Sequence, residues 1–490
     1  MMIRYCNIFL CALLIGCNIP LEKQTKEELP NILFLFADDF TYDAINALGN
    51  DIIQTPNLDR LVQNGTHFSQ AFNMGGWNGA VCMASRAMII TGKSIWRAKT
   101  LTDQWKSKNN LEAKDFSWGK LLEQKGYQTY MSGKWHISID PKNIFQTVRN
   151  VRPGMPRDFF NKPGKKGYDR PKTGEIDIWS PTDSLNGGFW EGGKHWSEVI
   201  KDDALDFIRQ SNEKKAPFFM YMAFNAPHDP RQSPQSFLDL YPLENIPLPK
   251  NWLTEYPFKD DIGNPKTLRD EALAPFPRTP FAIKTHIKEY YAIISHLDEQ
   301  IGKIIQALED SGKADNTYIF FTGDHGLSVG KHGLLGKQSM FDHSIRVPLT
   351  LAGPGIPKNN TVHHEVYLQD IMATTLEMAN IEAPASMEFK SFLSLAKGLE
   401  NQPLYPEGIY GAYINHQRMI RKNQFKLIVY PKTKKTLLFD LEQDPLEMND
   451  LSEEDEYQET VKELFEDLLI LQKKMKDTLD LKKIYSIDSV

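Results

Sequence analysis

Four segments of this 490-residue chain share one pattern, in which a run of apolar, aromatic and β-branched residues stops abruptly at a cluster of polar residues and glycine. The four runs are Asn31–Ala37, Tyr127–Met131, Pro217–Phe224 and Thr317–Thr322. Each run predicts a buried strand. The polar residues that follow place reactive side chains at the carboxyl end of every strand.

Helical patterns with recognisable start and stop signals lie between these runs. They cover residues 55–65, 115–126, 198–210 and 285–308. Strands that alternate with helices predict an α/β fold with a large, mostly parallel sheet sandwiched by helices. In such a sheet the binding crevice lies at the carboxyl ends of the strands, so we expect the four polar clusters to meet at one edge.

The character of the chain changes after about residue 400. A β-rich stretch, Met419–Asp440, precedes a charged helical pattern from Glu454 to Lys476. These segments predict a smaller α+β subdomain at residues 401–490, behind a catalytic domain at residues 31–400.

The N-terminal residues are typical of an export signal. The apolar run from Tyr5 to Ile15 is too short to span a bilayer. It closes at Leu14-Ile-Gly-Cys17, which resembles the lipobox of bacterial lipoproteins and implies cleavage before a lipidated Cys17. We therefore expect a signal peptide at residues 1–16, a tether at 17–30, and an exported lipoprotein of the bacterial cell envelope that meets the membrane only through its anchor. A plain signal peptide is the alternative.

The charge balance excludes one class of partner. The net charge is −6 and 24% of the residues are charged, so the chain lacks the basic excess of nucleic-acid-binding proteins. We expect no nucleic-acid partner.

Cysteine usage directs attention to one position. Of the four cysteines, three fall in or at the end of the signal, so Cys82 has no disulfide partner in the mature chain. A glycine-bearing loop at Gly79 and about two helical turns ending at Gly92 place Cys82 near a helix N-terminus. Helix N-termini attract anions, and Arg86 lies one turn further along. The alternative is an inert, buried cysteine.

The sequence Cys82-Met-Ala-Ser-Arg86, followed by Thr91-Gly92-Lys93, resembles the signature of the type I sulfatases, a formylglycine-dependent family of the alkaline-phosphatase-like superfamily. Further motifs follow in the order and approximate spacing of that family. They are Asp38-Asp39, Gly133-Lys134-Trp135-His136, Ala226-Pro227-His228, Gly323-Asp324-His325-Gly326, Gly336-Lys337 and, in the C-terminal part, Leu438–Asp450. Each motif is weak alone, but six in register are specific.

The resemblance implies that a formylglycine-generating enzyme oxidises Cys82 to formylglycine, whose hydrate attacks sulfur. It also implies a calcium site. The implied metal ligands are Asp38, Asp39, the group derived from Cys82, Asp324 and His325. The implied catalytic residues are Cys82, Arg86, Lys134, His136, His228, Asp324 and Lys337.

The implied roles follow from the chemistry of each side chain. Asp324 could act as the base that activates the hydrate, and Arg86 would hold it. Lys134, His136 and Lys337 would offset charge on the sulfate oxygens in the transition state. Either His228 or Lys337 could protonate the leaving alcohol. Taken alone, Asp38-Asp39 could be only a turn and a helix cap.

Two residues depart from the common family pattern. Ala84 replaces a more usual proline, which leaves open which generating enzyme modifies Cys82. His325 stands where many members have asparagine, and the Asp324-His325 pair resembles that of iduronate-type and other carbohydrate sulfatases. Because imidazole suits softer metals, zinc is an alternative to the expected calcium.

The predicted function is hydrolysis of the sulfate esters of a sulfated glycan, in polysaccharide breakdown. The stretch from Gly336 to Pro348 also resembles choline-sulfatase relatives, so a small sulfate ester is an alternative substrate. A phosphoester or phosphonate hydrolase of the same superfamily and a non-catalytic glycan-binding lipoprotein are further alternatives. The sugar, the sulfate position, endo or exo action and the oligomeric state stay open.

Overall fold

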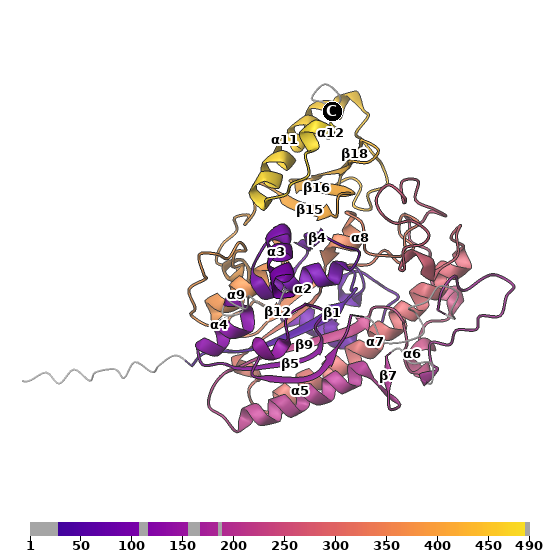
Figure 1. The fold of residues 1–490 in the computed structure, drawn as a ribbon. Helices are drawn as coiled ribbons and strands as arrows, with labels where there is room; N and C mark the ends of the chain where they lie inside the picture. The colour runs from indigo at the N-terminus through magenta and orange to yellow at the C-terminus, as the bar shows by residue number, and fades with distance from the viewer. Residues whose placement is uncertain (1–27, 107–115, 155–166, 185–188, 486–490) are drawn as a thin grey trace, which may run out of the picture.

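The computed structural model describes residues 28–106, 116–154, 167–184 and 189–485 (Figure 1). The predicted signal peptide, Cys17 and most of the predicted tether lie outside the described residues. No helix in the part of the chain that the structure describes is long and apolar enough to cross a membrane.

An eight-stranded sheet forms the centre of the larger part of the chain. Its order is β13-β2-β12-β10-β1-β9-β5-β6. The strands are β1 (Asn31–Asp38), β2 (Thr66–Phe68), β5 (Gln128–Lys134), β6 (Thr147–Arg152), β9 (Phe218–Pro227), β10 (Thr317–Gly323), β12 (Leu349–Ala352) and β13 (Asn360–Val362). The strands from β10 to β6 run parallel, and β12 is antiparallel to both of its neighbours. The predicted mostly parallel sheet is confirmed, and all four predicted strands belong to it.

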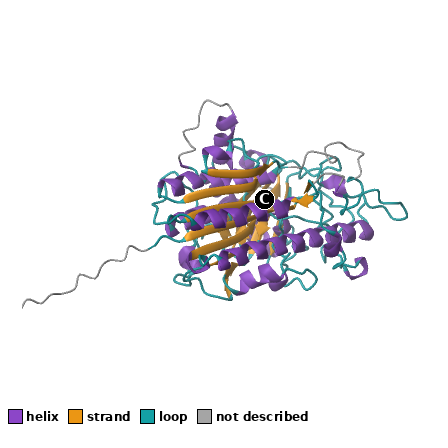
Figure 2. Ribbon diagram, turned by 90° about the horizontal axis from the view of Figure 1, so that it is seen from below, coloured by secondary structure: helices purple, strands orange, loops and turns teal. Residues whose placement is uncertain are grey.

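Helices cover both faces of this sheet (Figure 2). Alternate β1 residues enter two separate cores because successive strand side chains point to opposite faces. Leu33 and Leu35 pack with α1 (Pro56–Gln63), α5 (Trp196–Asn212) and α7 (Pro280–Asp310). On the other face, Phe34 and Phe36 pack with residues of α2 (Val81–Thr91), α4 (Trp118–Gln124), α9 (Asp370–Met378) and α10 (Leu393–Ala396).

Helix α7 begins earlier than its apolar pattern predicts. The sequence indicated residues 285–308, whereas the helix starts at Pro280. Thr279 caps it by accepting a hydrogen bond from the backbone N–H of Ala282, and Pro280 occupies the first helical position, where the absence of an N–H costs nothing.

The C-terminal part is the predicted α+β subdomain (Figure 1). Its five-stranded sheet has the order β18-β17-β16-β15-β4 and packs against α11 (Gln458–Met475). The strands are β4 (Gly75–Gly76), β15 (Ile409–Tyr413), β16 (Gln417–Lys422), β17 (Phe425–Tyr430) and β18 (Lys435–Asp440). Strand β4 lies far earlier in the chain and pairs in parallel with β15. The segment leading to Cys82 is therefore an edge of the C-terminal sheet.

Smaller elements complete the described fold. A three-stranded sheet joins β11 (Arg346–Val347), β3 (Ala71–Phe72) and β14 (Val366–Tyr367), and β7 (Trp190–Glu191) pairs with β8 (Lys194–His195). The remaining α-helices are α3 (Ile95–Lys106), α6 (Gln235–Leu238), α8 (Asp342–Ile345) and α12 (Leu481–Ile484). Short 3-10 turns cover Asn46–Leu48, Pro141–Asn143, Leu243–Asn245, Glu271–Leu273, Ala314–Asn316 and Asp455–Tyr457.

Candidate active site

The predicted site residues gather at the carboxyl edge of the parallel strands. Asp38 ends β1, Lys134 ends β5, His228 follows β9 and Asp324 follows β10. These strands are neighbours in the sheet, so four segments distant in sequence deliver their side chains to one place. The N-terminus of α2 lies against the same edge, where Ser85 donates a hydrogen bond to the carbonyl of Asp324 at 2.7 Å.

Cys82 is the second residue of α2 and only 2% exposed. Its Sγ lies 3.2 Å from Nδ1 of His136. Burial raises the pKa of the Cys82 thiol, but Lys134, His136 and Lys337 outweigh burial, so the pKa lies well below its usual value. The position therefore favours negative charge, as the sequence predicted from the helix N-terminus.

Arg86 lies beneath this position and is fully buried. Its Nε donates to Oδ2 of Asp324 at 3.0 Å, and its Nη1 donates to the carbonyl oxygen of Lys134 at 3.0 Å. The guanidinium thus ties the first turns of α2 to the ends of β10 and β5. Its Nη2 lies 3.9 Å from Oδ1 of Asp38.

Four side chains form a group whose ligand atoms all lie within 4.8 Å of one another: Asp38, Cys82, Asp324 and His325. Asp39 belongs to an overlapping group with Asp38 and His228. Within the described residues, Oδ1 of Asp38 and Nε2 of His325 are buried without a hydrogen-bond partner. Burial and the neighbouring Asp324 raise the pKa of Asp38 well above its usual value. Crowded carboxylates with unpaired ligand atoms fit a cation, and the ligand roles stay a prediction.

Two lysines lie against the paired aspartates. Lys134 forms a buried ion pair with Oδ2 of Asp38, and Nζ of Lys337 donates to Oδ1 of Asp39 at 2.8 Å. Both ammonium groups are nearly inaccessible to water. They are therefore held close to the site by charge and by burial.

The hydrogen bonds of His228 fix its tautomer. Its Nδ1 lies 2.7 Å from the backbone carbonyl oxygen of Asp229, which can only accept, so Nδ1 carries the proton. Nε2 then presents a lone pair, 3.8 Å from Oδ2 of Asp39. Burial, together with Lys337 and Lys134, lowers the pKa of His228 well below its usual value. In this tautomer His228 has no proton on Nε2, and the choice between His228 and Lys337 as the proton donor stays a prediction.

Five residues that the sequence motifs did not indicate as site residues line the cavity beside Cys82: Gly154, Leu268, Arg269, Asp270 and Gln338. This cavity of about 230 Å³ is also bordered by His136, His228 and Lys337. Arg269 and Asp270 lie in an irregular stretch without periodicity, and Gln338 directly follows the recognised Lys337. A charged pair inside an irregular stretch was the one available signal.

One buried tyrosine of α7, Tyr290, contacts the backbone that follows β1. Its hydroxyl donates to the carbonyl oxygen of Asp39 at 2.6 Å and accepts from the N–H of Thr41 at 3.0 Å. It therefore supports the backbone that presents Asp39. His286, on the same helix, is buried and has hydrogen-bond partners at both ring nitrogens.

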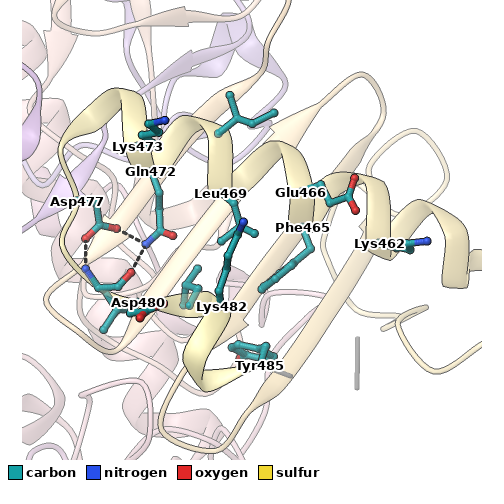
Figure 3. A pocket seen from close by; sticks show the side chains of 13 residues that line it. Lys462, Phe465, Glu466, Leu469, Gln472, Lys473, Asp477, Asp480, Lys482 and Tyr485 are labelled. Atoms are coloured by element: carbon teal, nitrogen blue, oxygen red, sulfur yellow. Dashed lines mark hydrogen bonds between the residues drawn. The ribbon is translucent and has the colours of Figure 1, made fainter. Parts of the chain in front are cut away.

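A second hollow of about 600 Å³ lies along α11 and α12, in the C-terminal subdomain (Figure 3). Phe465 and Leu469 of α11 line it, with the ring of Tyr485 5.3 Å from that of Phe465. None of the predicted site residues lines this hollow.

Comparison with known proteins gives a consistent result. A family model described as Sulfatase matches residues 30–381, and one described as N-sulphoglucosamine sulphohydrolase, C-terminal, matches residues 330–474. An arylsulfatase of Clostridium perfringens is 30% identical, over 88% of this chain and 92% of the relative. An N-acetylglucosamine-6-O-sulfatase of Bacteroides thetaiotaomicron is 27% identical, over 95% and 89%. A solved structure of a protein with its substrate D-glucosamine-2-N,6-O-disulfate is 25% identical and covers 92% of this chain and 99% of that chain, with a TM-score of 0.71.

Proposed function

We propose that this chain, which belongs to the sulfatase family and is a sulfuric ester hydrolase, releases sulfate from a sulfated carbohydrate by means of formylglycine at position 82 and a bound calcium ion. The family and the alkaline-phosphatase-like fold predicted from the sequence are confirmed. The maturation, the metal and the residue roles rest on the site described above.

The proposal rests mainly on the surroundings of the side chain at position 82, which has basic side chains and a cluster of carboxylates beside it. Lys134, His136 and Lys337 favour negative charge at this position. Asp38 and Asp324 offer carboxylate oxygens within 4.8 Å of Cys82 Sγ. Such a site can hold a nucleophilic oxygen and a sulfate group at the same time.

The metal site fits calcium by the chemistry of its donors. Asp38, Asp39 and Asp324 supply hard carboxylate oxygens, and Nε2 of His325 is available because its Nδ1 bonds the carbonyl oxygen of Gly326 at 2.9 Å. A bound calcium ion would offset negative charge on the sulfate group. The single nitrogen donor keeps zinc as an alternative that metal analysis can test.

Each residue of the chain has a task that follows from its position. The hydrated aldehyde supplies two hydroxyls, of which one attacks sulfur and the other lets sulfate leave as the aldehyde re-forms. Arg86 fixes Asp324 beside position 82, and His136 lies against the reacting side chain. Lys337 can give a proton to the departing alcohol oxygen, and Nε2 of His228 can accept a hydrogen bond.

The carbohydrate substrate is proposed from the relatives, because one is an N-acetylglucosamine-6-O-sulfatase and a structural neighbour holds a disulfated glucosamine. The test is to produce the chain together with a formylglycine-generating enzyme, verify the aldehyde at position 82 by mass spectrometry, and assay sulfate release from defined sulfated sugars. We expect turnover that is lost in Cys82→Ala with the melting temperature retained. Turnover that survives in this variant, or faster release of phosphate than of sulfate from matched aryl esters, would overturn the proposal.

The cellular location is part of the proposal. The lipobox-like Leu14-Ile-Gly-Cys17 supports export and a lipid anchor at Cys17, with the catalytic part outside the cytoplasm. Metabolic labelling with a fatty acid tests this directly. We expect label on the wild-type chain and none on Cys17→Ala. An unlabelled wild-type chain would refute the proposed lipid anchor.

A further inference from the structure

The mouth of the active-site cavity carries an arginine that none of the motifs includes. Arg269 borders the same cavity as Cys82, yet 29% of its side chain is exposed, whereas Cys82 is 2% exposed. Because the sulfate group must reach position 82 at the buried end, Arg269 lies where the alcohol portion of the ester would be.

Two buried carboxylates hold the Arg269 guanidinium. Its Nη1 pairs with Oδ2 of Asp229 and its Nη2 with Oδ1 of Asp270, and both carboxylates are only 5% exposed. A guanidinium has five N–H donors, so a fixed fork still has N–H groups for a ligand. The arginine is thus oriented before any substrate arrives.

The two carboxylates that hold the Arg269 guanidinium are connected to residues beside position 82. Nε2 of Gln338 donates to Oδ2 of Asp270 at 2.6 Å and to the carbonyl oxygen of Gly79 at 2.9 Å, and Gln338 directly follows Lys337. Asp229 directly follows His228, and Oδ1 of Asp229 lies 3.3 Å from Nδ1 of His228. The fork therefore has a defined position relative to position 82.

The charge at the mouth selects among alcohols. One guanidinium faces two carboxylates, so the Arg269, Asp229 and Asp270 group carries a surplus negative charge. Such a group disfavours a second sulfate or a carboxylate beside the ester. It suits hydroxyls, because arginine N–H groups donate to a hydroxyl oxygen and the cavity-lining Asp270 can accept from a hydroxyl hydrogen.

We propose that Arg269 and Asp270 are specificity-determining residues that bind the hydroxyls of an otherwise uncharged sugar ring next to the sulfate ester. This inference rests on the proposed sulfatase function and narrows its substrate class. The substrate is a monosulfated sugar unit with free neighbouring hydroxyls, in contrast to the disulfated ligand of the structural neighbour.

The experiment compares substrates that differ only in what Arg269 could touch. Formylglycine-bearing wild type and Arg269→Ala are assayed with monosulfated hexosamines and hexoses, with the disulfated counterpart of the best of them, and with 4-nitrophenyl sulfate, which has no sugar hydroxyls. Lys266→Ala is the matched control, because Lys266 is a half-exposed cation on the same loop that does not border the cavity.

We expect wild type to prefer the best monosulfated sugar to its disulfated counterpart. Arg269→Ala should lower kcat/KM for this sugar by about 10- to 100-fold, the effect of losing charge-assisted hydrogen bonds, and change kcat/KM for 4-nitrophenyl sulfate by less than about threefold. Arg269→Lys, which keeps the charge but not the fork, should recover only part of the loss. Lys266→Ala should match wild type on every substrate.

Three results would overturn the inference. These are a preference of wild type for the disulfated sugar, an equal loss on the sugar and the aryl ester in Arg269→Ala, and no loss on either. A wild-type enzyme with verified formylglycine that releases sulfate from none of these esters, 4-nitrophenyl sulfate included, would instead refute the proposed function itself.

Discussion

His136 has its place beside Cys82 because residue 154 lacks a side chain. An ideal Cβ built on Gly154 would lie 2.4 Å from both Cε1 and Nε2 of the His136 ring. Ordinary van der Waals contact begins at 3.4 Å, so in Gly154→Ala the ring must move by about 1.0 Å. The contact at stake is the 3.2 Å approach of His136 Nδ1 to Sγ at position 82.

A displacement of this size in an active site can cost about 100-fold in rate. We therefore expect Gly154→Ala to lower kcat for sulfate release by about 100-fold, with the melting temperature close to that of wild type because the ring borders an open cavity. The assay is steady-state sulfate release by enzyme with verified formylglycine, together with a thermal melt.

A double-mutant cycle makes the reasoning refutable. If the new methyl group acts only by displacing the His136 ring, Gly154→Ala should cost nothing further in a His136→Ala background. An equal loss in both backgrounds would show that Gly154 matters for another reason. Wild-type kcat in Gly154→Ala would show that the position of the ring is not critical.

Three further predictions concern the metal, the C-terminal subdomain and acid stability. Chelation should abolish sulfate release, and added calcium should restore it. Calcium should also raise the melting temperature of wild type but not of Asp324→Asn. An equal rise in both proteins would contradict a metal site at Asp324. Gln417→Leu, which removes three hydrogen bonds to the backbone at Ile262, Gln338 and Met340, should destabilise the fold by about 3 kcal/mol or more and lower kcat, and unchanged urea unfolding would refute this. Burial lowers the pKa of His332 to about 4, so neutral His332 stabilises the folded state above the unfolded pKa of 6.5, and this stabilisation is lost as the pH falls towards 4. His332→Asn should therefore reduce the pH slope of the unfolding free energy between these two values by up to about 1.4 kcal/mol per pH unit. An unchanged slope in urea titrations would contradict this prediction.

The sequence predicted the central sheet, and it predicted that the polar clusters meet at one edge of that sheet; both predictions have a physical reason. The apolar runs show in the sequence where each buried strand ends, and neighbouring parallel strands end at the same edge of a sheet. The side chains at these ends are therefore expected to lie close together, namely Asp38, Lys134, His228 and Asp324. The start of α7 was placed too late: Ala282 and Ile283 are buried and continue the apolar face of the helix, which begins at Pro280 behind the Thr279 cap.

The mouth of the cavity was not predictable in the same way. Arg269 and Asp270 lie in irregular backbone, and what brings them to position 82 is a set of pairwise contacts with Asp229 and Gln338. No period or spacing in a single sequence encodes such contacts. Gly154 is a similar case, because its importance lies in the space its missing side chain leaves for His136.

The C-terminal subdomain supports the catalytic edge through the loop that carries Lys337. Gln417 of β16 accepts from the N–H of Met340 and donates to the carbonyl oxygen of Gln338, and Lys426 of β17 donates to the carbonyl oxygen of Met340 at 3.2 Å. Strand β4, which leads to α2, is itself an edge of the same sheet. The two segments that present position 82 and Lys337 are thus both fixed by one sheet, so a shift of that sheet would move these two side chains together. Truncating the chain near residue 400 should therefore abolish turnover, because it removes β15, the partner strand of β4. It also removes Gln417 and Lys426, whose side chains bond the backbone of the loop that carries Lys337.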